Sequence, residues 1–310
     1  MRTSSNAPVF LVSPPRRDWT IRGKANVFAA AAEAPPTAEA ARADWLAVCE
    51  AIEGAGGVCA VVDNDVDGML TGLPYCAEAG LCGTDGATLV FVLPNLTPPH
   101  RQAEPKVIGP AVGRLGLTTR ALPKGVAFEG QGDVIRLGDR VVCTAGVGRW
   151  ARTSPEAYSH YRDLLGMPSL ALTFHADPWF HGNTFLGGYA RGADVVVIVC
   201  DEALADDGVA RLRAFADGAK FVSITAAQTL TYATNALQVG DTVLAPEGVP
   251  DVVIDAWRAL GLRVQLLALP ALFRKGGGAA VCLTNRLDGV AVEAVPDDMR
   301  LRAWRARQAP

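Results

Sequence analysis

An α/β fold is predicted for this chain, and two observations predict it. Short apolar runs rich in β-branched residues recur along the sequence, and segments rich in alanine and leucine with a helical period separate them. The alternation also continues evenly, because the Pro- and Gly-rich stretches 94–99 and 105–125 are short enough to be loops. We therefore predict a single domain over residues 1–310, with loose ends at 1–8 and 304–310.

Each predicted strand is a short run of apolar, mostly β-branched residues, as in Val195–Cys200. The predicted strands cover residues 9–12, 58–62, 88–93, 134–136, 140–144, 169–173, 194–199, 220–224, 242–245, 263–268 and 279–284. Several predicted helices begin at recognisable N-terminal signals, such as Thr37 followed by Glu39. They cover residues 37–54, 155–165, 203–216, 226–235 and 249–260.

The composition favours a small-molecule partner. Apolar residues make up 50% of the chain and charged residues 20%, with a formal net charge of -3 and no basic cluster typical of nucleic-acid binding. The apolar run 195–200 is too short to cross a bilayer, and residues 1–6 lead into a strand-like run rather than a long apolar signal core. Seven cysteines without framework spacing indicate reduced thiols. We predict a cytoplasmic protein that binds no membrane, with a homo-oligomer left open.

The most informative motif is a cysteine that follows a glycine run. Gly276–Gly278 precede Cys282, and no Lys-Ser/Thr follows at the spacing of a nucleotide-binding loop, so the glycines favour close backbone approach instead. If 279–284 is a strand, the thiol lies at a strand end, where a pocket can form. Taken alone, a buried structural cysteine is the more frequent case. That simpler interpretation also applies to Cys49, Cys59, Cys76, Cys82, Cys143 and Cys200.

Histidines and carboxylates upstream supply the other parts of a cysteine-based catalyst. His175 and Asp177 share one face if their strand continues, which places a base beside a carboxylate. His181 follows six residues after His175, but zinc sites usually show closer or helical spacing and a further ligand, so neither a metal nor a cofactor is predicted. Glu129 and Asp133 flank Gly-Gln-Gly, and a role as simple turn acids stays open.

The motifs become specific through their order along the chain. The series Phe128–Asp133, His175-x-Asp-x-x-Phe180 and Gly276–Thr284 resembles the guanidino-group modifying superfamily, also called the amidinotransferase or pentein superfamily. Its members include arginine deiminases, dimethylarginine dimethylaminohydrolases and amidinotransferases. Further similarity lies in Leu11–Pro15 with Asn26, in Arg101–Glu104 and in Gly148–Thr153, so the resemblance covers essentially the whole chain.

The resemblance implies a fold and a set of catalytic residues. The fold would be a single-domain propeller of five pseudo-symmetric ββαβ units around a central pocket. Cys282 matches the family's nucleophile, His175 its general acid and base, and Asp133 the carboxylate that accompanies the histidine.

The resemblance also implies how the substrate is held. Asp177 and Glu129 match positions that contact the guanidinium, and Arg101 and Arg152 match arginines that hold a substrate carboxylate in several members.

Two departures concern these binding groups. The aspartate of the family's Pro-Asp pair is missing, and Asp67 or Glu78 is expected to replace it. The motif from Glu129 to Asp133 also carries one extra residue, which can shift one carboxylate relative to the other.

A guanidinium carbon is a poor electrophile, so the chemistry needs a strong nucleophile and carboxylates that grip and polarise the group. Attack by the cysteine would give an S-amidino intermediate. Water as the second nucleophile makes the enzyme a hydrolase, and an amine makes it an amidinotransferase. We favour the hydrolase, because both Arg101 and Arg152 suit an amino-acid-like substrate and no long insertion suggests an acceptor site. A non-catalytic binding protein is the third alternative.

Overall fold

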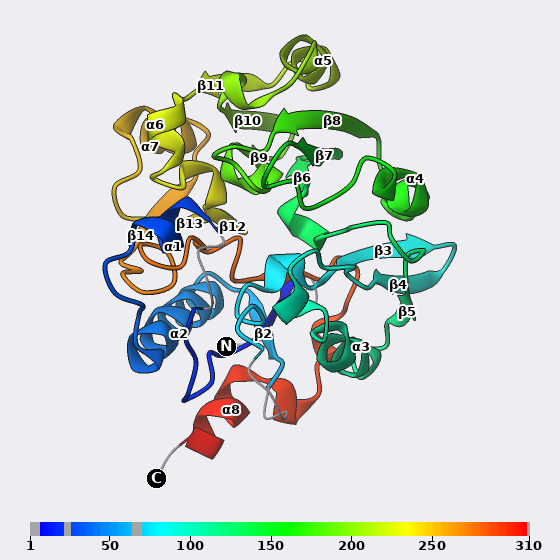
Figure 1. The fold of residues 1–310 in the computed structure, drawn as a ribbon, viewed down its shortest axis with the longest axis vertical. Helices are drawn as coiled ribbons and strands as arrows, with labels where there is room; N and C mark the ends of the chain where they lie inside the picture. The colour runs from blue at the N-terminus through cyan, green and yellow to red at the C-terminus, as the bar shows by residue number, and fades with distance from the viewer. Residues whose placement is uncertain (1–6, 22–25, 64–69, 309–310) are drawn as a thin grey trace.

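The computed structural model describes residues 7–21, 26–63 and 70–308, which form five small three-stranded sheets with helices between their strands. Each sheet contains one antiparallel pair of strands and one parallel pair. The parallel strands are joined through a helix, as a parallel crossover requires. The result is a mixed α/β fold (Figure 1).

Four of the sheets consist of consecutive strands. They are β3 (Leu81–Asp85), β4 (Thr88–Val92) and β5 (Thr118–Arg120) with α3 (Pro105–Gly113); β6 (Val134–Leu137), β7 (Arg140–Val147) and β8 (Ser169–His175) with α4 (Ala157–Tyr161); β9 (Leu186–Arg191), β10 (Asp194–Val199) and β11 (Lys220–Ser223) with α5 (Gly208–Phe215); and β12 (Leu237–Val239), β13 (Thr242–Pro246) and β14 (Arg263–Leu267) with α7 (Asp251–Ala259).

The remaining sheet joins the two ends of the chain. β1 (Val9–Val12) pairs in parallel with β2 (Val58–Val61) through α2 (Ala38–Gly54) and antiparallel with β15 (Asn285–Arg286). The short helices α1 (Val27–Ala31) and α6 (Ala226–Thr229) and the C-terminal helix α8 (Leu301–Gln308) lie outside this pattern. No helix of residues 7–21, 26–63 or 70–308 has the length and apolar character needed to cross a membrane.

The helices cover the sheets by burying one face each. In α2, Thr37 caps the N-terminus by accepting a hydrogen bond from the Ala40 N–H at 3.2 Å, and Trp45, Val48 and Ile52 are buried at helical spacing. Burial of each such side chain contributes about 1.5–3 kcal/mol to folding. The apolar face of α2 therefore packs into a buried cluster with residues of β1 and β2.

Most predicted elements are present, and three expectations were wrong. Residues 279–284 form successive turns instead of a strand, because the N–H groups of Leu283 and Thr284 bond to carbonyls of Ala279 and Val281 within the same segment. The supposed loop 105–125 contains α3, where Pro105 occupies the first turn and needs no N–H partner, and also β5. The supposedly loose C-terminus is α8 up to Gln308.

The short strands β3, β5, β9, β12 and β15 were not predicted. Helices 155–165 and 226–235 end early, at α4 and α6, and each is followed by a 3₁₀ turn.

Candidate active site

Cys282 lies in a turn between the glycine run and β15, and its side chain is buried. Asn235 holds it twice: its Nδ2 donates to Cys282 Sγ at 3.1 Å, and its Oδ1 accepts from the Cys282 N–H at 3.0 Å. Asn183 Oδ1 lies 3.8 Å from the same sulfur. One fully buried amide therefore fixes both the main chain and the sulfur of the cysteine.

The glycine run makes the close approach that its sequence predicts. A Cβ on Gly278 would overlap the ring of Tyr75 and lie 3.1 Å from the Cβ of Cys282. Gly277 has φ +80°, a backbone conformation that favours glycine. Asn26 donates from Nδ2 to the Gly276 carbonyl at 3.0 Å. The glycine run therefore lets the backbone pass close to the ring of Tyr75 just before Cys282.

The thiol is protonated at neutral pH in this environment. Burial raises the pKa of Cys282 to about 11, although the hydrogen bonds from Asn235 and Asn183 favour the thiolate. A cation brought next to the sulfur would lower that pKa. Formation of the thiolate at neutral pH therefore requires a positive charge close to the sulfur.

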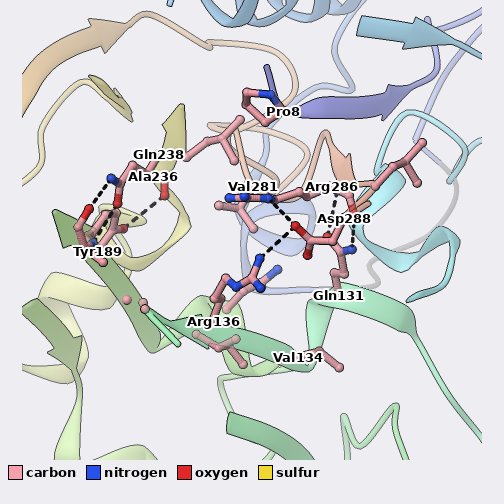
Figure 2. A pocket seen from close by; sticks show the side chains of 18 of the residues that line it. Pro8, Gln131, Val134, Arg136, Tyr189, Ala236, Gln238, Val281, Arg286 and Asp288 are labelled. Atoms are coloured by element: carbon pink, nitrogen blue, oxygen red, sulfur yellow. Dashed lines mark hydrogen bonds and ion pairs between the residues drawn. The ribbon is translucent and has the colours of Figure 1, made fainter. Parts of the chain in front are cut away.

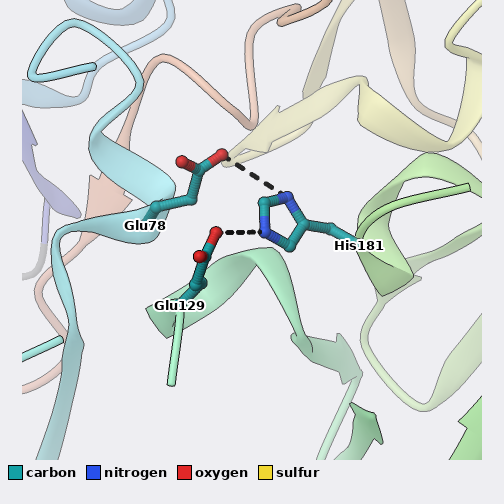
Figure 3. Close-up of side chains that lie close together, drawn as sticks. All are labelled: Glu78, Glu129 and His181. Atoms are coloured by element: carbon teal, nitrogen blue, oxygen red, sulfur yellow. Dashed lines mark hydrogen bonds and ion pairs between the residues drawn. The ribbon is translucent and has the colours of Figure 1, made fainter. Parts of the chain in front are cut away.

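His181 is the histidine at the centre of the polar cluster. Its Nε2 lies 2.9 Å from Glu129 Oε2, and its Nδ1 lies 3.4 Å from Glu78 Oε1 (Figure 3). Burial alone would raise the pKa of Glu129, but the hydrogen bond with His181 and the charge of Arg152 bring it down to about 2. Glu129 is therefore ionised and accepts from Nε2–H, which leaves Nδ1 as the nitrogen that can exchange a proton.

Asp133 supports the histidine through the main chain. Its Oδ1 accepts from the Gly182 N–H and from Thr144 Oγ1, both at 2.8 Å. Burial raises the pKa of Asp133. The carboxylate hydrogen-bonded to the imidazole is thus Glu129, whereas Asp133 fixes the residue after His181.

The glycines between these two carboxylates also have a structural reason. A Cβ on Gly132 would lie 3.0 Å from His181 Cγ, so a side chain there would press on the imidazole. The extra residue, Gln131, bonds to the other side of the site: its Nε2 donates to the Arg286 carbonyl at 2.7 Å, and its Oε1 accepts from the Arg286 N–H at 2.9 Å. The insertion therefore ties the Glu129 motif to β15.

Arg101 is buried in a network of carboxylates. Its Nε and Nη2 bond both oxygens of Glu104 at 2.8 and 2.7 Å, and its Nη1 pairs with Glu78. Nη2 also donates to the Gly72 carbonyl at 3.0 Å. Every nitrogen of the guanidinium therefore has a partner within the protein, which leaves little capacity for the expected role of holding a substrate carboxylate. The geometry makes Arg101 the group that positions Glu78.

Arg152 is the arginine that borders open space. Its Nη1 lies 3.4 Å from Glu129 Oε2, its guanidinium carbon lies 5.9 Å from the ring centre of Phe180, and its side chain is 11% exposed. It lines a cavity of about 70 Å³ together with Tyr75, Glu78, Arg101 and His181. The cavity wall continues along Gly276 and Gly277, the start of the segment that carries Cys282.

His175 and Asp177 lie away from this cluster. β8 ends at His175, and the side chains of both residues are exposed. The continued strand that would have placed them on a catalytic face is not there. Sequence reasoning gave His181 only a secondary role, and a signal was available: His181 follows the apolar pair Trp179-Phe180 and precedes Asn183, which reaches the thiol. Asp67 falls outside the described residues.

The buried cluster of charged side chains around the cavity contains more carboxylates than guanidinium groups. Four carboxylates are buried in the cluster around it, and the two arginines of the cluster supply fewer positive charges. The carboxylates belong to Glu78, Glu104, Glu129 and Asp133, and the guanidinium groups to Arg101 and Arg152. A cationic ligand would balance this excess, because buried charges are stable only when paired.

The same side chains include a donor set for a metal ion. Glu78, Glu129 and His181 each place one ligand atom within 4.8 Å of the others (Figure 3). Both carboxylates, however, already contact a guanidinium. An organic cation of guanidinium shape fits the planar carboxylate edges at least as well as a metal does.

Known proteins resemble this chain in sequence and in fold. No family model matches the sequence. The N(G),N(G)-dimethylarginine dimethylaminohydrolase of Mycobacterium tuberculosis is 27% identical over 221 residues, which span 69% of this chain and 67% of that protein. The predicted resemblance to the guanidino-group modifying superfamily is confirmed.

Solved structures show the same fold. The N-terminal domain of ArgZ, an arginine dihydrolase from cyanobacteria, superposes with a TM-score of 0.78 at 20% identity, over 91% of this chain and 98% of that one. A dimethylarginine dimethylaminohydrolase gives 0.65 at 17% identity, over 90% and 99%. AgrE matches with 0.77 at 22% identity, and this chain spans 41% of its length.

Proposed function

We propose that this protein hydrolyses a guanidino C–N bond of arginine or an arginine derivative through an S-amidino cysteine. The observation that carries the proposal is a buried thiol held by Asn235 beside an acidic cavity that contains a histidine–glutamate pair. The sequence relative is named as a dimethylaminohydrolase and the ArgZ relative as an arginine dihydrolase, and one ArgZ structure holds a covalent reaction intermediate.

Substrate binding would prepare the nucleophile. The guanidinium enters the cavity lined by Glu78 and His181, beside the buried carboxylate of Glu129, and balances the excess of carboxylates in the cluster. Its positive charge then lies close to Cys282 and lowers the pKa of the thiol from about 11. The substrate thereby helps to generate the thiolate that attacks it, and the free enzyme carries little reactive thiolate.

The first half of the reaction forms a C–S bond and breaks a C–N bond. The thiol proton passes to Nδ1 of His181 as the Cys282 thiolate adds to the guanidinium carbon, and His181 then delivers that proton to the departing amine. Glu129, hydrogen-bonded to Nε2–H, holds the imidazole in orientation and stabilises its charged form. The amine leaves, and an amidino group remains on sulfur.

The second half returns the enzyme to its starting state. A water molecule gives a proton to Nδ1 of His181 and attacks the amidino carbon, and the C–S bond breaks to give a ureido product and the thiol. Arg152 borders the cavity and is placed to contact a substrate carboxylate. Replacement of water by an amine would make the protein an amidinotransferase. The named relatives that are hydrolases favour water.

We also infer that the five sheets are pseudo-symmetric units of one propeller-like domain. Each sheet combines an antiparallel pair with a parallel pair, and the β15–β1–β2 sheet completes the set from both chain ends. The seven cysteines are all free, which suits a reducing compartment such as the cytoplasm.

The proposal is tested by product analysis on a nucleophile variant. Cys282→Ser should fold normally yet lose turnover of arginine, methylated arginines, agmatine and guanidinoacetate by about a thousandfold or more. Cys200→Ser, which alters a buried cysteine at the end of β10, should keep wild-type rates. Acid quench of the wild type during turnover should trap one amidino group on Cys282.

Three outcomes would contradict the proposal. More than a few per cent of activity in Cys282→Ser would reject the nucleophile. Amidino transfer to an added amine in preference to water would assign the transferase alternative. Binding of a guanidino compound with no turnover of any tested substrate would leave a binding protein.

A further inference from the structure

A second, larger cavity lies outside the acidic site. It has a volume of about 860 Å³ and is bordered by β6, β9, β12 and the chain around β15 (Figure 2). Its lining shares no residue with the acidic cavity, yet it includes Asn183 and Val281, which contact or adjoin Cys282. Of the residues that line this cavity, Asn183 is the one that contacts the thiol of the proposed reaction.

The larger cavity has charged side chains of its own. Asp288 Oδ1 accepts from Arg136 Nη1 and from Arg286 Nε, both at 2.8 Å, so two guanidinium groups share one carboxylate oxygen (Figure 2). These three are the charged members of the described lining. The lining therefore keeps an excess of one positive charge.

Hydrogen-bond donors are also left over at this place. Arg286 uses Nε for Asp288, and its two Nη groups have no partner within the described part of the chain. Asn183, only 2% exposed, lines the same cavity with an Nδ2 that is buried without a hydrogen-bond partner. N–H donors without a protein partner, beside a net positive charge, can bind the oxygen atoms of an oxyanion.

Apolar side chains restrict the kind of oxyanion. Val134 and Val281 lie below and above the Arg136–Asp288 pair in the view of Figure 2, and Leu186 and Leu237 belong to the same lining. Such walls desolvate a short hydrocarbon body and add affinity in proportion to its area, whereas a phosphate ion has no apolar part to bury. We propose that this cavity binds a small organic carboxylate with a short apolar body, its carboxylate on Arg136 and Arg286.

The inference is independent of the proposed hydrolase activity, because the carboxylate would bind Arg136 and Arg286, which the proposed reaction does not use. The two cavities would sort ligands by charge: guanidinium cations enter the acidic site and carboxylate anions the basic one. Binding is therefore measured directly, and turnover is not the readout.

The test is titration calorimetry at low salt with 3-methylbutanoate as the probe. Wild-type protein should bind one equivalent saturably, and protein alkylated at Cys282 with iodoacetamide should bind it equally. Arg136→Gln/Arg286→Gln should weaken binding by at least about tenfold. Arg258→Gln, an exposed arginine of α7, should bind as the wild type does. Acetate, which lacks the apolar body, should bind more weakly than the probe.

Asp288→Asn keeps the test decisive if the double variant unfolds. Removal of the carboxylate that competes for both arginines should tighten 3-methylbutanoate binding, whereas a merely structural aspartate would give no gain. The proposal fails if 3-methylbutanoate shows no saturable binding up to about 10 mM, or if binding is unchanged in both the double variant and Asp288→Asn. Tighter binding of inorganic phosphate than of the probe would overturn the carboxylate assignment.

Discussion

His175 and His181 are six residues apart, and the structure gives them opposite environments. His175 ends β8 and is exposed, whereas His181 is buried between Glu78 and Glu129. The two segments also differ in their neighbours: Asp177 near the first is exposed, and Asn183 in the second contacts the thiol of Cys282. Burial with paired carboxylates, rather than nearness in sequence to an acid, separates a candidate proton carrier from a surface histidine.

The largest expected effect tests this difference directly. His181→Ala should lower kcat/KM by about 10²–10⁴-fold, because both the leaving amine and the attacking water need proton transfer. His175→Ala should stay within about twofold of the wild type, since its side chain is exposed. Steady-state kinetics with arginine and methylated arginines would measure both. Equal losses in the two variants would break the distinction, and recovery of His181→Ala by added zinc would point to a metal site instead.

The carboxylates beside the two histidines sharpen the same comparison. Glu129→Gln keeps the shape of the side chain but removes the charge that holds His181 Nε2–H, so kcat should fall by about a hundredfold. The pKa of Glu129, about 2, means that the wild-type carboxylate stays ionised, and the loss should be constant between about pH 5 and about pH 9. Asp177→Asn is the matched control and should be silent. A loss of kcat in Asp177→Asn as large as that in Glu129→Gln would show that the segment His175–Asp177 takes part in the reaction.

A smaller effect is expected from the arginine at the cavity wall. Arg152→Gln should lower kcat/KM for arginine roughly 10- to 150-fold, which corresponds to about 1.5–3 kcal/mol. The value of kcat/KM for agmatine, which lacks the carboxylate, should hardly change. Arg149→Gln alters an exposed neighbour and serves as the control. Equal losses for arginine and agmatine would show that Arg152 acts only through Glu129, which it contacts at 3.4 Å.

The smallest effect concerns the resting thiol. Because the pKa of Cys282 is raised to about 11, its rate of alkylation by iodoacetamide in the free protein should climb about tenfold per pH unit between about pH 7 and about pH 10. Peptide mass analysis distinguishes Cys282 from the other cysteines. A plateau below about pH 8 would mean that the cluster already stabilises the thiolate without substrate.

The sequence predicted the fold class well where strands are buried on both faces. The run Val196–Val199 in β10 is continuous and β-branched because the residues on either side pack into the core. β9 was missed because Gly187 and Gly188 interrupt it, and each lets another backbone approach closely. β5 and β12 have three residues each, too few to establish an alternating pattern.

The site could be predicted only in part, for a different physical reason. Motif order located Cys282, Glu129 and Asp133, all of which lie in the buried cluster or its support. The choice between two histidines, however, depends on where β8 ends, and strand ends are poorly encoded locally. The engagement of Arg101 by Glu78 and Glu104 depends on segments brought together by folding, as does the hold of Asn235 on Cys282.

The pairing of β1 with β15 has a consequence for biosynthesis. Leu11 lies opposite Asn285, so β1 has its parallel neighbour β2 early but lacks its antiparallel neighbour until nearly all of the described chain has been made. Cys282 precedes that final strand by three residues and is positioned by Gln131, Asn235 and the β15 backbone together. A nascent chain would therefore carry the acidic residues of the cluster long before Cys282, the proposed nucleophile, is held in place. Its reactive centre would assemble in the last step of folding.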